Sequence, residues 1–213
     1  MIRELLAPPP SPLRELPFAV IDLETTGGSP KAHWDREERF HPASEITEVG
    51  LVTLCGTVVQ DRWNSLAAIE GPFPAAIQRL TGITPGLLAG APPWERVALA
   101  FAARAEGRIW VAHHAPFDGS FLKAWCPEGL WKRHRLVCTR LLAKRFAPEV
   151  GSFSLASLCG FFGIHNRRAH RALADAEATA ELLGILIRRA EEQGVDAEAF
   201  LATGTLDWAR ISG

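Results

Sequence analysis

The chain has 213 residues, of which 47% are hydrophobic and 22% are charged, and its formal net charge is −1. These values are typical of one globular domain and exclude a polycation, so any nucleic acid must be bound by a local basic patch. No apolar run approaches the ~18 residues of a membrane span, and the N-terminus lacks the apolar core of a signal peptide. The four cysteines are scattered without a C-x-x-C pair. We therefore expect reduced thiols in a cytoplasmic protein that does not bind a membrane.

The chain order predicts a proline-rich lead-in over residues 1–16, one domain over 17–192, and a short helix and tail over 193–213. The first strand is expected at 18–24, where an apolar run of β-forming residues ends in two acids and a Gly-Gly turn. Residues 27–44 show no clear period and many charges, which predicts a long loop that is functional or mobile.

Two β-rich runs, at 46–54 and 57–64, flank Cys55-Gly56 and predict a hairpin. Further strands are expected at 108–112 and 136–139, and helices at 74–80, 94–105, 116–124, 141–146, 154–162 and 171–192. Strands first, and then strands alternating with helices, predict an α/β fold. We expect a mixed five-stranded sheet, three antiparallel strands followed by parallel ones, with helices on both faces.

Asp22 and Glu24 end the first strand, two residues apart. Side chains alternate across a strand, so both carboxylates point to the same side. Two like charges held this close repel, and ionising both inside a protein requires a cation. Carboxylate oxygens suit Mg²⁺ or Mn²⁺. The alternative is a strand whose polar end carries two solvated acids.

Two later segments offer further acids. Asp118 falls in the first turn of the helix predicted after the 108–112 strand, where a favourable interaction with the helix dipole is the simpler explanation. His170 and Asp175 would diverge by about 140° on one continuous helix. If His170 precedes the helix and Asp175 lies one turn in, both can face one cleft. Otherwise His170 is a solvated loop histidine and Asp175 an acid at a helix start.

Three segments in order resemble the DnaQ-like, or DEDDh, 3′→5′ exonucleases, in particular the proofreading epsilon subunit of bacterial DNA polymerase III. Asp22-Leu-Glu-Thr-Thr-Gly27 is a full match to the first motif of that family. The second is His113-His-Ala-Pro-Phe-Asp118, in which His114 replaces the usual Asn, and the spacing of His170 to Asp175 fits the third. Ile46-Thr-Glu-Val-Gly50 and Leu80-Thr-Gly-Ile-Thr84 are similar to intervening family segments, and the resemblance covers roughly residues 17–190.

The resemblance implies a ribonuclease H-like exonuclease fold and a two-metal-ion hydrolysis of phosphodiester bonds at the 3′ end of DNA. Asp22 would bridge two Mg²⁺ or Mn²⁺ ions, Glu24 and Asp175 would complete one of them, and Asp118 would support the second. His170 would accept the proton of the attacking water, because imidazole titrates near neutral pH. Substrate contacts would come from a wider set: Thr25 and Thr26 through backbone N–H groups, and His113, Phe117, Arg168 and Arg171.

The segment from Gly129 to Arg171 contains nine basic residues and a single acid, Glu149, which gives +8 in a chain of net −1. A solvated basic face explains any one of them, whereas the group as a whole, flanking His170, favours phosphate contacts. The expected partner is the 3′ end of single-stranded or frayed DNA, with a DNA polymerase as a further partner in proofreading or repair. Two alternatives remain open: an exoribonuclease that trims RNA 3′ ends, and a non-catalytic nucleic-acid-binding module.

Overall fold

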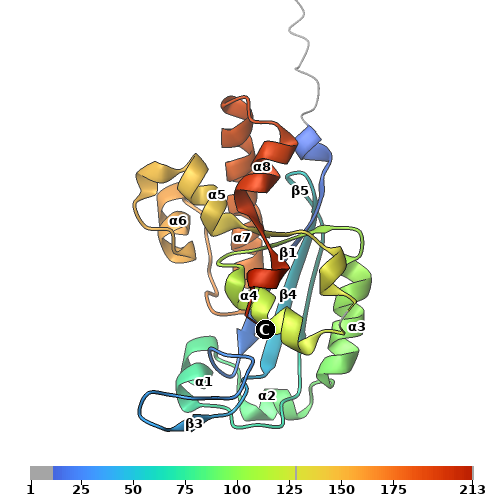
Figure 1. The fold of residues 1–213 in the computed structure, drawn as a ribbon, viewed down its shortest axis with the longest axis vertical. Helices are drawn as coiled ribbons and strands as arrows, with labels where there is room; N and C mark the ends of the chain where they lie inside the picture. Colours follow the sequence, from blue (N-terminus) through green and yellow to red (C-terminus); the bar gives the residue numbers. More distant parts are fainter. Residues whose placement is uncertain (1–11, 128, 213) are drawn as a thin grey trace, which may run out of the picture.

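The computed structural model describes residues 12–127 and 129–212, and its centre is a mixed six-stranded sheet in the order β5-β4-β1-β6-β7-β8 (Figure 1). β1 lies in the middle, antiparallel to β4 on one side and parallel to β6 on the other. The strands are β1 (Pro17–Thr25), β4 (Ile46–Cys55), β5 (Val58–Leu66), β6 (Ile109–Ala112), β7 (Leu136–Cys138) and β8 (Thr205–Leu206). The carboxyl ends of the parallel strands β1, β6 and β7 therefore share one edge of the sheet.

Helices cover both faces of the sheet. One face packs against α5 (Thr139–Phe146), α6 (Leu155–Phe162), α7 (Ala172–Glu192) and α8 (Ala197–Gly204). The other packs against α3 (Trp94–Ala105) and α4 (Pro116–Trp125), while the short α1 (Ala75–Thr81) and α2 (Pro85–Ala89) lie near the lower end in Figure 1. Four 3₁₀ turns complete the described chain: Pro12–Glu15, Trp131–Arg133, Pro148–Val150 and Trp208–Arg210.

Alternation along β1 divides the core between the two faces. Phe18 and Val20 are buried with α7, whereas Ala19, Ile21 and Leu23 are buried with α3 and α4. Asp22 and Glu24 continue the even-numbered series. The pattern thus places both carboxylates on the α7 face, where the apolar core gives way to the sheet edge.

The predicted α/β class and helices on both faces are confirmed, but the expected count of five strands is wrong. The sixth strand, β8, comes from the segment expected to be only a helix and tail, and it pairs antiparallel with β7. Residues 27–44 are not all loop, because β2 (His33–Trp34) and β3 (Phe40–His41) form a small hairpin there. Helix α2 also lies outside the predicted elements.

Most of the proline-rich lead-in falls at residues 1–11, outside the described residues. The part that is described belongs to the fold, since Leu13 is fully buried and Arg14 forms an ion pair of 2.7 Å with Glu191. Within residues 12–127 and 129–212, none of the helices combines the length and the apolar character that crossing a membrane requires.

Candidate active site

The site forms where β1 outruns its parallel neighbour. β1 pairs with β6 only from Phe18 to Val20, while its pairing with β4 continues to Thr25. The side of β1 that faces β6 is therefore open beyond Val20, with backbone groups that need partners. Openings of this kind, at the carboxyl end of a strand that separates two sheet halves, are common ligand sites in α/β proteins.

Asp118 fills this opening from the first turn of α4. Its Oδ1 atom accepts a hydrogen bond of 3.1 Å from the backbone N–H of Leu23, which satisfies a donor that β6 no longer reaches. The carboxyl group is 3% exposed, and burial raises its pKa to about 8. Asp118 is therefore held beside Asp22 by the structure of the strand itself, and helix-dipole stabilisation alone does not describe it.

Helix α7 brings Asp175 to the same place, and Gly50 makes its approach possible. Gly50 is the register partner of Asp22 on β4, and a Cβ atom there would lie 2.3 Å from the carbonyl carbon and oxygen of Ala172. Any larger residue at position 50 would push the first turn of α7 off the sheet. Asp175, one turn into α7, is buried above β1 as a result.

Asp22, Glu24 and Asp175 each offer a carboxylate oxygen within 4.8 Å of the other two. Burial, and then the charges of Asp118 and Asp175, raise the pKa of Asp22 well above its ordinary value. Burial, and then the charges of Asp175, Glu48 and Asp118, raise the pKa of Glu24 to about 8, while Arg171 has a smaller opposing effect. In the described part of the chain none of Asp22, Glu24, Asp118 and Asp175 forms an ion pair; Arg171, which is bound to Glu48, offsets only part of the effect on Glu24.

This donor set fits divalent metal ions. Three converging carboxylates supply only hard oxygen ligands, which Mg²⁺ and Mn²⁺ prefer, and a bound cation would offset the repulsion that helps to raise the pKa values of Asp22 and Glu24. Asp22, Glu24 and Asp175 would hold an ion directly, and Asp118 lies close enough to influence it.

Glu48 is a fifth acid, and it has its own counter-ion. It is 1% exposed, lies directly opposite Glu24 across β1 and β4, and binds the Arg171 guanidinium through two hydrogen bonds of 2.8 and 2.9 Å. It also accepts the Ala172 N–H at 3.1 Å, at the start of α7. The pair anchors the helix that carries Asp175. Sequence reasoning gave Glu48 no role, and its place within the β-forming run Ile46–Gly50 is the one signal that could have marked it as buried.

The backbone between residues 166 and 170 is fastened to Asp175. The side-chain amide of Asn166 donates to Oδ1, and the backbone N–H of His170 donates to Oδ2 at 2.9 Å. His170 adopts φ 64°, in the left-handed region that is uncommon for a residue other than glycine. Its exposed side chain and Asp175 both line a cavity of about 500 Å³ beside α6. Asn166 was not expected at the site, because no motif includes it.

The two threonines after Glu24 are both held in the turn, and Thr26 does not present its backbone N–H as expected. Thr26 uses its N–H in a 2.8 Å hydrogen bond to the Glu45 carbonyl, so the prediction that this group is available to a nucleotide is wrong. The Thr25 hydroxyl donates to the Gly27 carbonyl at 2.7 Å, and both threonines are buried. They shape the turn that follows Glu24.

His113 links three segments around the site. Its Nε2 lies 3.1 Å from the Phe153 carbonyl, which can only accept, so Nδ1 accepts from the Thr139 hydroxyl at 2.9 Å. Burial, with a smaller effect of Arg140, lowers the pKa of His113 to about 4, and it is neutral at pH 7. His114 is exposed with φ 59°, and its Nδ1 lies 3.2 Å from Arg140. Phe117 is half-buried and packs against Phe121.

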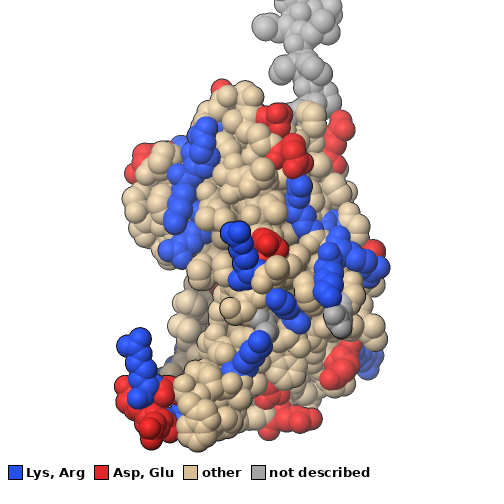
Figure 2. Space-filling view, in the orientation of Figure 1, with Lys and Arg blue, Asp and Glu red and all other residues tan. Residues whose placement is uncertain are grey.

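The basic residues of the 129–171 segment do not form one patch. Arg135 pairs with Glu198 at 3.0 Å, and Arg171 is held by Glu48. Figure 2 shows Lys and Arg side chains in separate groups over the side of the molecule that faces the viewer in Figure 1. Arg168 is exposed, and its side chain forms no ion pair in the described structure, so it is free to meet a phosphate.

The comparisons with known proteins agree with this geometry. The exonuclease family model (RNase_T) matches residues 19–183. The epsilon subunit of DNA polymerase III from Aquifex aeolicus is 32% identical over 167 residues, 78% of this chain and 77% of that protein. A Mycobacterium tuberculosis protein, whose name gives it both exonuclease and endonuclease activity, is 38% identical over 89% of this chain. Exonuclease X, solved with 5′-overhanging duplex DNA, has TM-score 0.65 at 24% identity and covers 87% of this chain and 98% of that one.

A ribonuclease H-like sheet with a cluster of partly buried acids at its carboxyl edge, together with these matches, supports a nuclease class of hydrolase. The chain belongs to the exonuclease family. The match to the Mycobacterium tuberculosis protein spans only 29% of that longer protein.

Proposed function

We propose that the protein is a 3′→5′ exonuclease that releases nucleoside 5′-monophosphates from single-stranded or frayed DNA ends. The observation that supports this most is the uncompensated group of Asp22, Glu24 and Asp175 within 4.8 Å, with Asp118 beside it. When two Mg²⁺ or Mn²⁺ ions are bound there, they supply an activated water and stabilise the charge on the departing sugar oxygen.

Side chains of the protein itself carry out proton transfer and hold the substrate. His170 accepts the proton of the attacking water, because its imidazole is exposed on a turn fastened to Asp175. Phe117 and Arg168 contact the terminal nucleotides by packing and by charge. Arg171 acts by holding Glu48 and α7 in place, which suits a positioning role better than the direct contact expected from sequence.

The biological setting follows from the relatives. The name of the Aquifex aeolicus relative, a DNA polymerase III subunit, supports a polymerase partner, and we propose a proofreading or repair role with it. A cytoplasmic location fits four cysteines that are all free thiols in the structure.

The test uses 5′-labelled single strands of DNA and RNA with Mn²⁺, analysed by product length over time. We expect successive shortening from the 3′ end, inhibition by a 3′-terminal phosphate, no effect of a 5′ block, and faster cleavage of DNA than of RNA. Equal rates on 3′- and 5′-blocked strands would contradict the proposed direction. Preferential RNA cleavage would instead support the exoribonuclease alternative, and binding without cleavage would support a non-catalytic module.

A further inference from the structure

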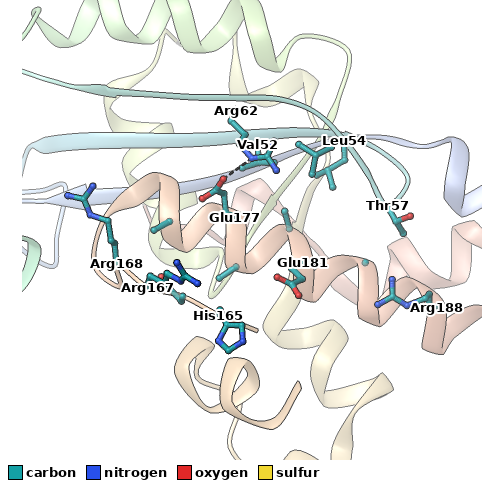
Figure 3. A pocket seen from close by; sticks show the side chains of 16 residues that line it. Val52, Leu54, Thr57, Arg62, His165, Arg167, Arg168, Glu177, Glu181 and Arg188 are labelled. Carbon is teal, nitrogen blue, oxygen red and sulfur yellow. Dashed lines mark hydrogen bonds and ion pairs between the residues drawn. The ribbon is translucent and has the colours of Figure 1, made fainter. Parts of the chain in front are cut away.

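A second hollow runs along the flank of α7, outside the carboxylate cluster. It has a volume of about 530 Å³ and lies between α7, the strands β4 and β5, and residues 165–168 (Figure 3). Ala174, Ala178 and Gly184 line it from the helix, so small side chains leave the space open. From Ala174 to Arg188 the helix rises by ~21 Å, which is long enough for several nucleotides.

Arginines from three separate segments surround this groove: Arg62 on β5, Arg167 and Arg168 before α7, and Arg188 further along α7 (Figure 3). Arg62 pairs with Glu177 at 2.7 Å. The side chains of Arg167, Arg168 and Arg188 are exposed and form no ion pair within the described residues.

The groove also contains acids. Besides Glu177, it is lined by Glu181, so the lining has four arginines against two glutamates and a net charge of +2. The formal net charge of the whole chain, by comparison, is −1. An excess of positive charge, contributed by unpaired guanidinium groups, favours an anionic occupant with more than one charge.

The groove and the active site share a lining residue. Asn166 lines both the groove and the cavity beside His170, and its amide donates to Asp175. Ala174, at the near end of the groove, directly precedes Asp175 in α7. An extended anion at this end lies beside the segment that is bonded to Asp175, and it can follow the groove towards Arg188.

We propose that this groove binds the sugar-phosphate backbone of the strand being degraded, 5′ of the cleaved bond. The proposal rests on the proposed exonuclease function and adds a distal contact to it. Guanidinium groups contact phosphates without reading bases, so binding is independent of sequence and weakens with salt. Short substrates that end before Arg188 do not use the distal part of the groove.

The test compares Arg188→Ala and Glu181→Gln with wild type on a trinucleotide and a 20-mer, through kcat/KM with Mn²⁺. Arg188→Ala should lower kcat/KM for the 20-mer roughly threefold and reduce its salt slope by roughly 0.7, the worth of one phosphate contact. Glu181→Gln should raise the same quantity. Neither substitution should change kcat/KM for the trinucleotide. Arg96→Ala, an equally exposed charge on α3, is the matched control and should change nothing.

Equal effects of Arg188→Ala on both substrates, or none on either, would overturn the groove assignment, as would an equal effect of Arg96→Ala. Binding of a labelled 20-mer in EDTA, followed by fluorescence anisotropy, separates this from the proposed function. If wild type cleaves nothing, the exonuclease proposal fails. The groove assignment then stands or falls on whether Arg188→Ala weakens, and Glu181→Gln strengthens, that binding.

Discussion

Glu24 and Glu48 face each other across β1 and β4, yet the two acids have opposite surroundings. Glu48 is held by Arg171 and by the first N–H of α7, so its charge is matched. Glu24 joins Asp22 and Asp175 in a group without an ion pair, and its pKa rises to about 8. One acid therefore stabilises the fold, and the other is held in an unfavourable environment that a bound cation would relieve. Partners, rather than residue type, decide which role a carboxylate takes.

The sharpest way to break this comparison is to neutralise an acid of the unmatched group. Asp22→Asn should reduce hydrolysis by roughly 10³-fold or more, because several kcal/mol of transition-state stabilisation through bound metal is lost. Stability in EDTA should stay the same or rise, since repulsion is removed. Rates and thermal melts in EDTA measure both quantities. A variant that is inactive only because it unfolds would contradict the account.

Substitution of His170 distinguishes metal binding from proton transfer. His170→Ala should lower turnover by roughly 10²–10⁴-fold, the usual worth of a positioned base, while DNA and Mn²⁺ binding remain. Arg168→Ala should act differently, by weakening DNA binding in a salt-dependent way. Saturating kinetics combined with binding titrations distinguish the two. Near wild-type turnover in His170→Ala would remove the proposed base.

Substitution of Glu48, the acid that has a counter-ion, should lower the stability of the protein, unlike substitution of Asp22. Glu48→Gln leaves Arg171 with a neutral partner at the base of α7, and breaking a buried pair in this way typically costs about 3 kcal/mol of the free energy of unfolding. Chemical denaturation in EDTA measures the loss. If Glu48→Gln were as stable as wild type while Asp22→Asn was destabilised, the contrast between the two environments would be reversed.

A further expected effect is the pH dependence of the stability of the metal-free protein. Glu24 and Asp118, both with a pKa raised to about 8, keep protons when folded that the unfolded chain releases near pH 4. Their contribution to stability is thus present below pH 4 and is lost as the pH rises towards 8. We expect the melting temperature in EDTA to fall from pH 5 to pH 8, and the slope to be shallower in Asp22→Asn. A melting temperature that rises over this range would exclude raised pKa values at the site.

Local signals predicted much of this architecture. The helix at 94–105 was placed at its observed bounds, and the alternation from Phe18 to Glu24 put Asp22 and Glu24 on one face of a strand. These features depend on periodicity and on residue type within a few positions. The motifs led us to expect Asp118 and Asp175 near that strand, and both lie beside it; their catalytic roles are part of the proposed function.

Features that depend on distant partners could not be predicted in this way. The Glu48–Arg171 pair joins residues that are 123 positions apart. The N–H of Thr26 donates to the carbonyl of Glu45, 19 residues away, and is therefore not available to a nucleotide. β8 has only two residues, too few to show alternation, and is defined by its pairing with β7. Gly50 reads as an ordinary strand glycine until α7 is seen lying against it.

The central claim is that the unmatched acids, and not the matched one, hold the divalent ions. A Mn²⁺ titration followed by melting temperature, in wild type, Asp22→Asn and Glu48→Gln, tests it most directly. We expect wild type and Glu48→Gln to gain a similar increment from different starting points, and Asp22→Asn to gain little. An equal gain in Asp22→Asn, or a gain lost only in Glu48→Gln, would contradict the account.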